Sequence, residues 1–194
     1  MGLTLANVLT ILRMVVVPFF IMLVGYNRCG WALVLFIAAG ITDLLDGLIA
    51  RVWAQQTKVG AILDPLADKL LLTAAFIMLA LPDRPKAFPE LELLNHVPIY
   101  LVIITISRDL FISLVAMVMY MALGRTKFPP SLLGKLTTTA QILTVAVTLL
   151  CNYLGLVSAV WVPTLIWLSL SLTVLSGFHY IYLATPLANK EPRS

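Results

Sequence analysis

The sequence predicts an all-α membrane protein with six transmembrane helices. Of its 194 residues, 61% are hydrophobic and only 11% are charged, whereas a soluble domain carries about a quarter charged residues. The apolar residues fall into six runs, and each is close to the roughly 20 residues that a helix needs to cross a bilayer. The runs are 4–25, 30–51, 60–82, 97–124, 135–156 and 158–184.

The first run is expected to remain in the protein as a helix. It lacks a basic start, Arg13 interrupts the apolar stretch, and no small-x-small cleavage site follows it, so it does not resemble a cleaved signal sequence. The polar connection YNRCG separates it from the second run, and RVWAQQTKVG separates the second run from the third.

The last three runs follow connections that contain charged and turn-forming residues. DRPKAFPELELLNH precedes the fourth run, RTKFPPSLLG precedes the fifth, and a short turn near Gly155 separates the fifth from the sixth. The sequence therefore predicts one six-helix domain over residues 1–184 and a polar tail over 185–194. Cys29 and Cys151 lie far apart, outside any CxxC motif, and are expected to be packing residues.

The distribution of Lys and Arg predicts the orientation, because cytoplasmic loops are enriched in these residues. Eight lie on one side of the six predicted spans and three on the other. The eight are Arg13, Arg51, Lys58, Arg125, Lys127, Lys135, Lys190 and Arg193, and the three are Arg28, Arg84 and Lys86. Both termini are therefore expected in the cytoplasm. The chain is expected in the inner membrane of a bacterial cell, with an organelle membrane as the alternative. The net charge of +4 without a basic cluster favours anionic lipid surfaces and argues against a nucleic-acid partner.

Four aspartates lie inside two of the predicted spans, where an ionisable side chain is costly and usually functional. They are Asp43 and Asp46 in the second run and Asp64 and Asp68 in the third. Spacings of three and four residues place each pair on one helix face. With a rise of about 1.5 Å per residue, Asp43 and Asp68 lie at one depth and Asp46 and Asp64 at another. The pattern predicts four carboxylates facing one another on the cytoplasmic side.

Four carboxylates with no His or Cys nearby favour hard divalent cations such as Mg²⁺ or Mn²⁺ and argue against zinc. They can support two ions about 3.5–4 Å apart, an arrangement used in phosphoryl chemistry. Gly47, Ala50 and Gly60 lie on or beside the acidic face and leave room for a bulky ligand. Arg51, at the mouth, can bind phosphate oxygens in a fork. Together they predict a pyrophosphate site at a lipid interface.

Two other interpretations fit intramembrane acids. The aspartates could pair with the intramembrane cations Lys69 and Arg108, or they could line the path of a divalent-cation transporter. The transporter is disfavoured because all four acids cluster on one half of the membrane and no broken-helix repeat accompanies them.

The string Asp43-Leu-Leu-Asp46-Gly47-Leu-Ile-Ala50-Arg51, followed by Gly60-Ala-Ile-Leu-Asp64-Pro-Leu-Ala-Asp68, resembles the signature of the CDP-alcohol phosphotransferase family at every fixed position. Further motifs resemble its bacterial phosphatidylglycerophosphate synthase branch. They are Asn7-x2-Thr10-x2-Arg13, Ala67-Asp68-Lys69 and Gly134-Lys135-x-Thr137-Thr138-x-Ala140-Gln141.

This resemblance implies a six-helix membrane enzyme, usually a homodimer, that transfers a phosphatidyl group from CDP-diacylglycerol to an alcohol and releases CMP. It implies that Asp43, Asp46 and Asp64 bind the metals and that Asp68 completes the set and acts as general base. A second group is implied to line the cytidine and pyrophosphate pocket: Gly47, Ala50, Arg51 and Gly60. Asn7 and Thr10 either hydrogen-bond cytidine or join the first helix to the second, and the resemblance favours cytidine.

The acceptor is expected to be glycerol-3-phosphate, whose phosphate needs cationic partners. The candidates are Arg108, Lys135, Arg125 and Lys127. An ion pair between Arg108 and Asp109 or Asp68 is the alternative for Arg108. The segment Pro129-Pro130-Ser131 resembles eukaryotic-type cardiolipin synthases of the same family, which use phosphatidylglycerol. That acceptor therefore stays open as an alternative.

Overall fold

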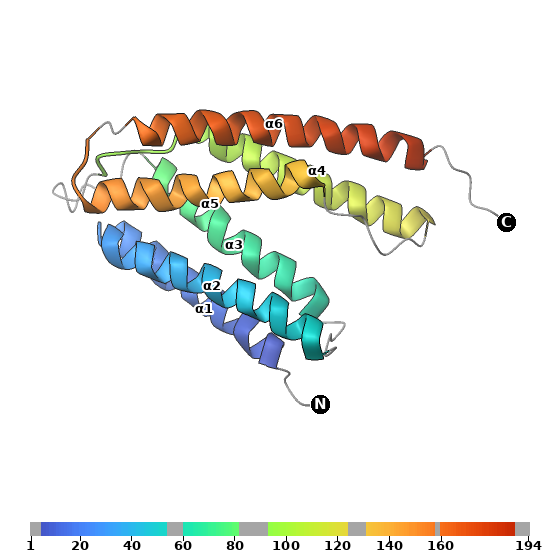
Figure 1. Cartoon of the computed structure of the whole chain (residues 1–194), viewed down its shortest axis with the longest axis horizontal. Helices are drawn as coiled ribbons and strands as arrows, with labels where there is room; N and C mark the ends of the chain where they lie inside the picture. The colour runs from blue at the N-terminus through green and yellow to red at the C-terminus, as the bar shows by residue number, and fades with distance from the viewer. Residues whose placement is uncertain (1–4, 54–59, 82–92, 124–130, 158–159, 189–194) are drawn as a thin grey trace. The chain divides into compact units, whose positions relative to one another are not determined.

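Six α-helices make up the described part of the chain (Figure 1). They are α1 (Leu5–Gly25), α2 (Cys29–Trp53), α3 (Gly60–Ala80), α4 (Ile99–Leu123), α5 (Leu132–Tyr153) and α6 (Trp161–Ala188). The structure is a computed structural model that describes the backbone of residues 5–53, 60–81, 93–123, 131–157 and 160–188. Within these ranges, the side chains of residues 5–11, 13, 43–53, 60–68, 116–123 and 183–188 lie outside the description. The described ranges contain no strand, which confirms the all-α prediction.

Each helix coincides with one predicted apolar run, although the ends differ by a few residues. Helix α5 begins at Leu132, earlier than the expected 135, and α6 continues to Ala188, past the expected end at 184. The earlier start of α5 has a local cause. The Gly134 N–H donates a 3.0 Å hydrogen bond to Ser131 Oγ, so Ser131 caps the first turn as an N-cap serine does.

Residues in the left-handed conformation end two of the helices. Asn27 has φ 54° and Gly155 has φ 68°, and in both cases the next N–H bonds back to a carbonyl five residues earlier. Arg28 N donates to Leu23 O at 2.8 Å and Leu156 N to Cys151 O at 2.9 Å. This is the Schellman pattern of helix C-termini, and it confirms the predicted turn near Gly155.

The chain divides into two compact units. The first comprises Met1–Val97 and Val145–Ala159, and the second comprises Pro98–Thr144 and Val160–Ser194. In the first unit α1 packs against both α2 and α3. The core there is aromatic and aliphatic, with the rings of Phe20 and Phe36 6.0 Å apart between centroids and Phe76 buried. Cys29 and Cys151 are buried and neither forms a disulfide, as expected of packing residues.

The second unit buries a row of polar side chains between its helices. Gln141 of α5 is 1% exposed and donates to Thr105 of α4 at 3.4 Å and to Thr173 of α6 at 3.2 Å. Thr144 of α5 and Ser169 of α6 share a 2.7 Å hydrogen bond. Within lipid the hydrophobic effect contributes little to the association of helices, and hydrogen bonds of this kind help to hold them together.

Two asparagines join the segment before α4 to the end of α5 within the first unit. The Asn95 N–H donates to Asn152 Oδ1 at 2.8 Å, and Asn152 Nδ2 donates to Asn95 O at 3.0 Å. Asn95 Nδ2 also donates to Leu156 O at 2.7 Å. Asn95 is 7% exposed, so these bonds satisfy groups that water does not reach.

Asn152→Leu is expected to lower the free energy of unfolding by about 2 kcal/mol, because it leaves the buried N–H and C=O of Asn95 without partners. Thermal unfolding in detergent micelles measures the loss. Leu154→Ala, at a neighbouring side chain that is 55% exposed, serves as the control and should unfold like the wild type. Equal melting temperatures for Asn152→Leu and the control would contradict the prediction.

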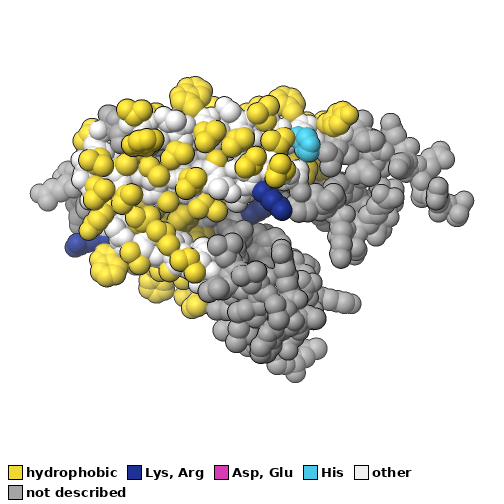
Figure 2. Space-filling model, in the orientation of Figure 1, with side chains coloured by type: hydrophobic (Ala, Val, Ile, Leu, Met, Phe, Trp, Pro, Cys, Tyr) yellow, Lys and Arg dark blue, Asp and Glu magenta, His cyan; other side chains and the backbone are white. Residues whose placement is uncertain are grey.

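Apolar side chains dominate the described surface (Figure 2). Two described segments are long and apolar enough to cross a membrane: Leu132–Tyr153, which is α5, and Trp161–Tyr182 of α6. Shorter apolar stretches lie in α1, α2 and α3, at Met14–Gly25, Cys29–Thr42 and Lys69–Ala80. An extensive exposed apolar surface on long helices is typical of a protein that faces lipid. The prediction of six spans and the domain boundary at 184 both stay predictions.

Candidate active site

The four aspartates of the motif lie at the same end of the first unit. Asp43 and Asp46 fall in the second half of α2, and Asp64 and Asp68 in the first half of α3. Figure 1 shows the end of α2 and the start of α3 close together, beside the start of α1. The two helix halves that carry the pairs therefore follow one another along the chain, which is compatible with the predicted cluster. Their side chains lie outside the description, so their role as metal ligands stays a prediction.

The residues expected to contact the nucleotide lie on the same three helix ends. Asn7 and Thr10 belong to the first turns of α1, and Gly60 begins α3. Near the end of α2 lie Gly47, Ala50 and Arg51. Because α1 packs against both other helices, these backbone positions are compatible with one pocket. Their side chains also lie outside the description.

The carboxylates that the sequence predicts as ligands of a divalent ion lie outside the described side chains. Among the side chains that the structure describes, no group of three His, Cys, Asp or Glu residues could hold a metal ion. The aspartates of α2 and α3 offer up to four carboxylates from adjoining helix ends, and oxygen donors of this type suit Mg²⁺ and Mn²⁺.

Arg108 of α4 is the best-defined polar feature of the second unit. Its side chain is 11% exposed, and its Nη1 donates to Asp109 Oδ1 at 2.7 Å. Its Nη2 donates to Ser176 Oγ of α6, also at 2.7 Å. The guanidinium carbon lies 5.8 Å from the centroid of the Tyr180 ring, within cation–π range. The ion pair with Asp109, expected as one alternative, is therefore present, while the side chain of Asp68 lies outside the description.

The start of α5 lies close to this guanidinium. A Cβ added at Gly134 would lie 3.4 Å from Arg108 Nη2 and 3.3 Å from the Tyr180 hydroxyl. A residue without a side chain at this position lets the arginine and the tyrosine approach the helix backbone. Lys135, the next residue, is exposed. Arg125 and Lys127, the other two acceptor candidates, lie outside the described residues.

The sequence matches a known family over most of its length. The CDP-alcohol phosphatidyltransferase pattern covers residues 3–175. The chain belongs to the CDP-alcohol phosphatidyltransferase family. This confirms the resemblance drawn from the aspartate motif and makes the chain an enzyme.

Curated relatives of this phosphatidyltransferase extend the match. A protein of Sodalis glossinidius named CDP-diacylglycerol–glycerol-3-phosphate 3-phosphatidyltransferase is 35% identical over 189 residues, which cover 95% of this chain and 96% of the relative. A protein of Haemophilus influenzae with the same name is 33% identical over 91% of this chain and 90% of its own length. A Mycobacterium tuberculosis protein named probable phosphatidylglycerophosphate synthase is 31% identical over 185 residues, which cover 91% of this chain and 79% of the relative.

Sequence reasoning on this phosphatidyltransferase missed the partners of Arg108 on α6. Ser176 and Tyr180 were not among the candidates, and neither was Gly134 as a contact of the guanidinium. A signal existed in the spacing of Ser169, Thr173, Ser176 and Tyr180. Intervals of four, three and four residues place them on one face of a helix, and a polar face within an apolar helix indicates a protein-facing side.

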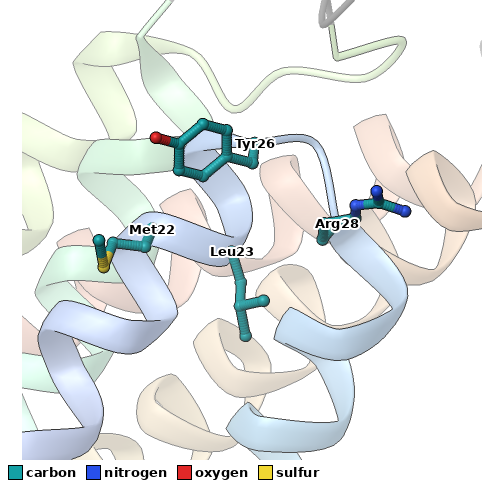
Figure 3. Close-up of a pocket in the computed structure, with 4 residues that line it drawn as sticks. All are labelled: Met22, Leu23, Tyr26 and Arg28. Carbon is teal, nitrogen blue, oxygen red and sulfur yellow. The ribbon is translucent and has the colours of Figure 1, made fainter.

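An open pocket of about 430 Å³ lies in the first unit, where α1 ends. Its lining comprises Met22, Leu23, Tyr26 and Arg28 (Figure 3). The polar tips of Tyr26 and Arg28 point in different directions in Figure 3. None of the four belongs to the predicted site, and in Figure 1 the end of α1 lies away from the end of α2 and the start of α3. The pocket is an open surface recess at the end of α1.

Proposed function

We propose that the protein transfers the phosphatidyl group of CDP-diacylglycerol to glycerol-3-phosphate, forming phosphatidylglycerophosphate and CMP. The observation that carries the proposal is the end-to-end match to relatives with that named activity, at 35% identity over 95% of the chain in one case. The intact aspartate motif adds chemical support, since its residues lie on adjoining helix ends. Membership of a phosphatidyltransferase family favours this enzyme over the cation transporter.

In the proposed site Asp43, Asp46, Asp64 and Asp68 hold two divalent ions, Mg²⁺ or Mn²⁺. When bound, such ions neutralise the pyrophosphate of the lipid donor and make CMP a better leaving group. Arg51 binds phosphate oxygens through its guanidinium. Gly47, Ala50 and Gly60 leave space for the nucleotide, and Asn7 and Thr10 hydrogen-bond the cytidine.

Asp68 acts as the general base in this proposal. The acceptor hydroxyl attacks the phosphorus that bears diacylglycerol, and the bond from that phosphorus to the oxygen shared with CMP breaks. The proton of the hydroxyl passes to the Asp68 carboxylate as the new O–P bond forms. The products are the phosphatidylated acceptor and CMP, which carries the electron pair of the broken bond.

Arg108 and Lys135 supply positive charge for the phosphate of the acceptor, with Arg125 and Lys127 as further candidates. The support for Arg108 is its partial burial together with an incomplete set of hydrogen bonds. Its two bonds, to Asp109 and Ser176, use two of the five N–H groups of a guanidinium. The remaining donors are of the kind that binds phosphate oxygens.

The proposal places the enzyme in the bacterial inner membrane, as a homodimer with six spans and both termini in the cytoplasm. The apolar surface and the two long apolar helices support a membrane location. The excess of Lys and Arg on one side of the predicted spans supports the orientation.

Purified protein given CDP-diacylglycerol is expected to release CMP only when glycerol-3-phosphate and a divalent cation are both present. Chelation with EDTA should abolish turnover, because the carboxylates cannot bind the pyrophosphate without a cation. Added Mg²⁺ or Mn²⁺ should restore it. Release of CMP is measured by chromatography, and the lipid product by mass spectrometry.

The control reactions replace glycerol-3-phosphate with phosphatidylglycerol, inositol phosphate or serine. If phosphatidylglycerol is the only acceptor that gives a lipid product, the chain is a cardiolipin synthase of the same family. Undiminished turnover in EDTA would remove the metal from the proposal.

A further inference from the structure

The Arg108 guanidinium is held on several sides by α4 and α6. Asp109 binds Nη1 and Ser176 binds Nη2, each at 2.7 Å. The ring of Tyr180 lies 5.8 Å from the guanidinium carbon. Two hydrogen bonds from different nitrogens and one ring contact restrict the rotation of a planar group. The guanidinium is thus oriented by side chains of the protein itself.

The same guanidinium retains unused hydrogen-bonding capacity. Its Nε is buried and has no hydrogen-bond partner. A buried donor without a partner costs free energy, and such a group in a folded protein calls for a specific explanation. An arginine that is fixed in place but not saturated with partners is prepared to bind an anion, because little side-chain entropy remains to be lost on binding.

Tyr180 is positioned to determine where the guanidinium lies. Its hydroxyl would be 3.3 Å from a Cβ at Gly134, and Arg108 Nη2 would be 3.4 Å from the same point. The Tyr180 hydroxyl and the Arg108 guanidinium therefore both lie close to the backbone of α5 at Gly134. The ring of Tyr180 makes a cation–π contact with the same guanidinium. Ser176 precedes Tyr180 by one helical turn and bonds Nη2, so both residues of α6 act on the same group.

We propose that Tyr180 is a positioning residue that, together with Ser176, orients Arg108 to bind the phosphate of the acceptor. This inference rests on the proposed function, since it takes a phosphate-bearing alcohol as the second substrate. Tyr180 acts through Arg108, and the aromatic ring, more than the hydroxyl, carries the effect because the ring makes the cation–π contact.

The test compares the KM for the acceptor and kcat among variants at saturating CDP-diacylglycerol. Tyr180→Leu removes the ring and is expected to raise the KM for glycerol-3-phosphate about tenfold, with kcat and the KM for CDP-diacylglycerol within about twofold of wild type. Tyr180→Phe keeps the ring and should remain within about twofold in all three. Tyr182→Leu, at a tyrosine that is 77% exposed on the same helix, is the matched control and should resemble wild type.

The double variant Arg108→Gln/Tyr180→Leu tests whether Tyr180 works through Arg108. Once Arg108 is lost, Tyr180→Leu should raise the KM no further, since residues that act through one contact are not additive. A further tenfold rise in that background would overturn the proposal. So would a defect in Tyr180→Phe as large as that in Tyr180→Leu, or a loss spread equally over kcat and both KM values.

Two measures keep the result interpretable. Melting temperatures in detergent check folding, and Tyr180→Met replaces Tyr180→Leu if the leucine variant does not fold, because methionine fills irregular space. The acceptor of the wild-type enzyme is determined first. Failure of glycerol-3-phosphate as a substrate would refute the proposed function, whereas an unchanged KM of Tyr180→Leu for the true acceptor would refute the role of Tyr180.

Discussion

Asp68→Asn is expected to lower the rate of CMP release roughly 10²- to 10⁴-fold, the usual contribution of a general base. Asparagine has the shape of aspartate but cannot accept the proton of the acceptor hydroxyl. Because Asp43, Asp46 and Asp64, which are proposed only as metal ligands, all remain, binding of CDP-diacylglycerol in the presence of Mg²⁺ should persist. Single-turnover CMP release measures the chemical step, and equilibrium binding of the nucleotide lipid measures the ground state.

Asp64→Asn provides the contrast for Asp68→Asn. Asp64 lies four residues earlier on α3 and is proposed only as a metal ligand. Its variant should lose metal-dependent binding of the nucleotide lipid together with turnover. Full activity in Asp68→Asn would remove Asp68 from the role of base. Loss of lipid binding equal to that of Asp64→Asn would assign Asp68 to the metals alone.

Arg108→Gln is expected to raise the KM for glycerol-3-phosphate roughly 10- to 100-fold, because hydrogen bonds from a charged donor contribute more than neutral ones. The KM for CDP-diacylglycerol should change little. Steady-state kinetics with each substrate varied in turn measures the two constants. Arg108→Lys should fall between wild type and glutamine, since it keeps the charge but loses the planar fork.

Arg28→Gln is the matched control for Arg108→Gln. Arg28 is exposed in the first unit and lines the recess at the end of α1. The KM values of Arg28→Gln for both substrates should therefore equal those of wild type. An unchanged KM for the acceptor in Arg108→Gln would reduce Arg108 to a structural ion pair with Asp109.

The helices were predictable from sequence because each depends on local features. Apolar runs of about 20 residues indicate membrane helices, and turn-forming residues such as Gly155 indicate where they end. The structure confirms that turn through the φ of 68° at Gly155. Helix ends were less predictable. The start of α5 depends on a hydrogen bond from the Gly134 N–H to Ser131, which apolar periodicity does not report.

The candidate site was predictable to the extent that its residues follow one another along the chain. The aspartates of α2 and α3 belong to a single motif, and intervals of three and four residues suffice to place each pair on one helix face. The environment of Arg108 was only partly predictable. Its pairing with Asp109 involves the next residue in the chain, so the sequence already suggested it. The contacts with Ser176 and Tyr180 come from residues about 70 positions later.

The sequence by itself determined the helical class, the approximate limits of six helices and the family to which the aspartate motif points. All three depend on interactions between residues that are near neighbours in the chain, which spacing and hydrophobicity describe. Only the tertiary structure decided that α6 supplies a serine and a tyrosine to an arginine of α4, above a glycine of α5. Contacts between distant segments depend on how side chains of particular shape pack across helices, and the order of residues along one helix does not specify its neighbours.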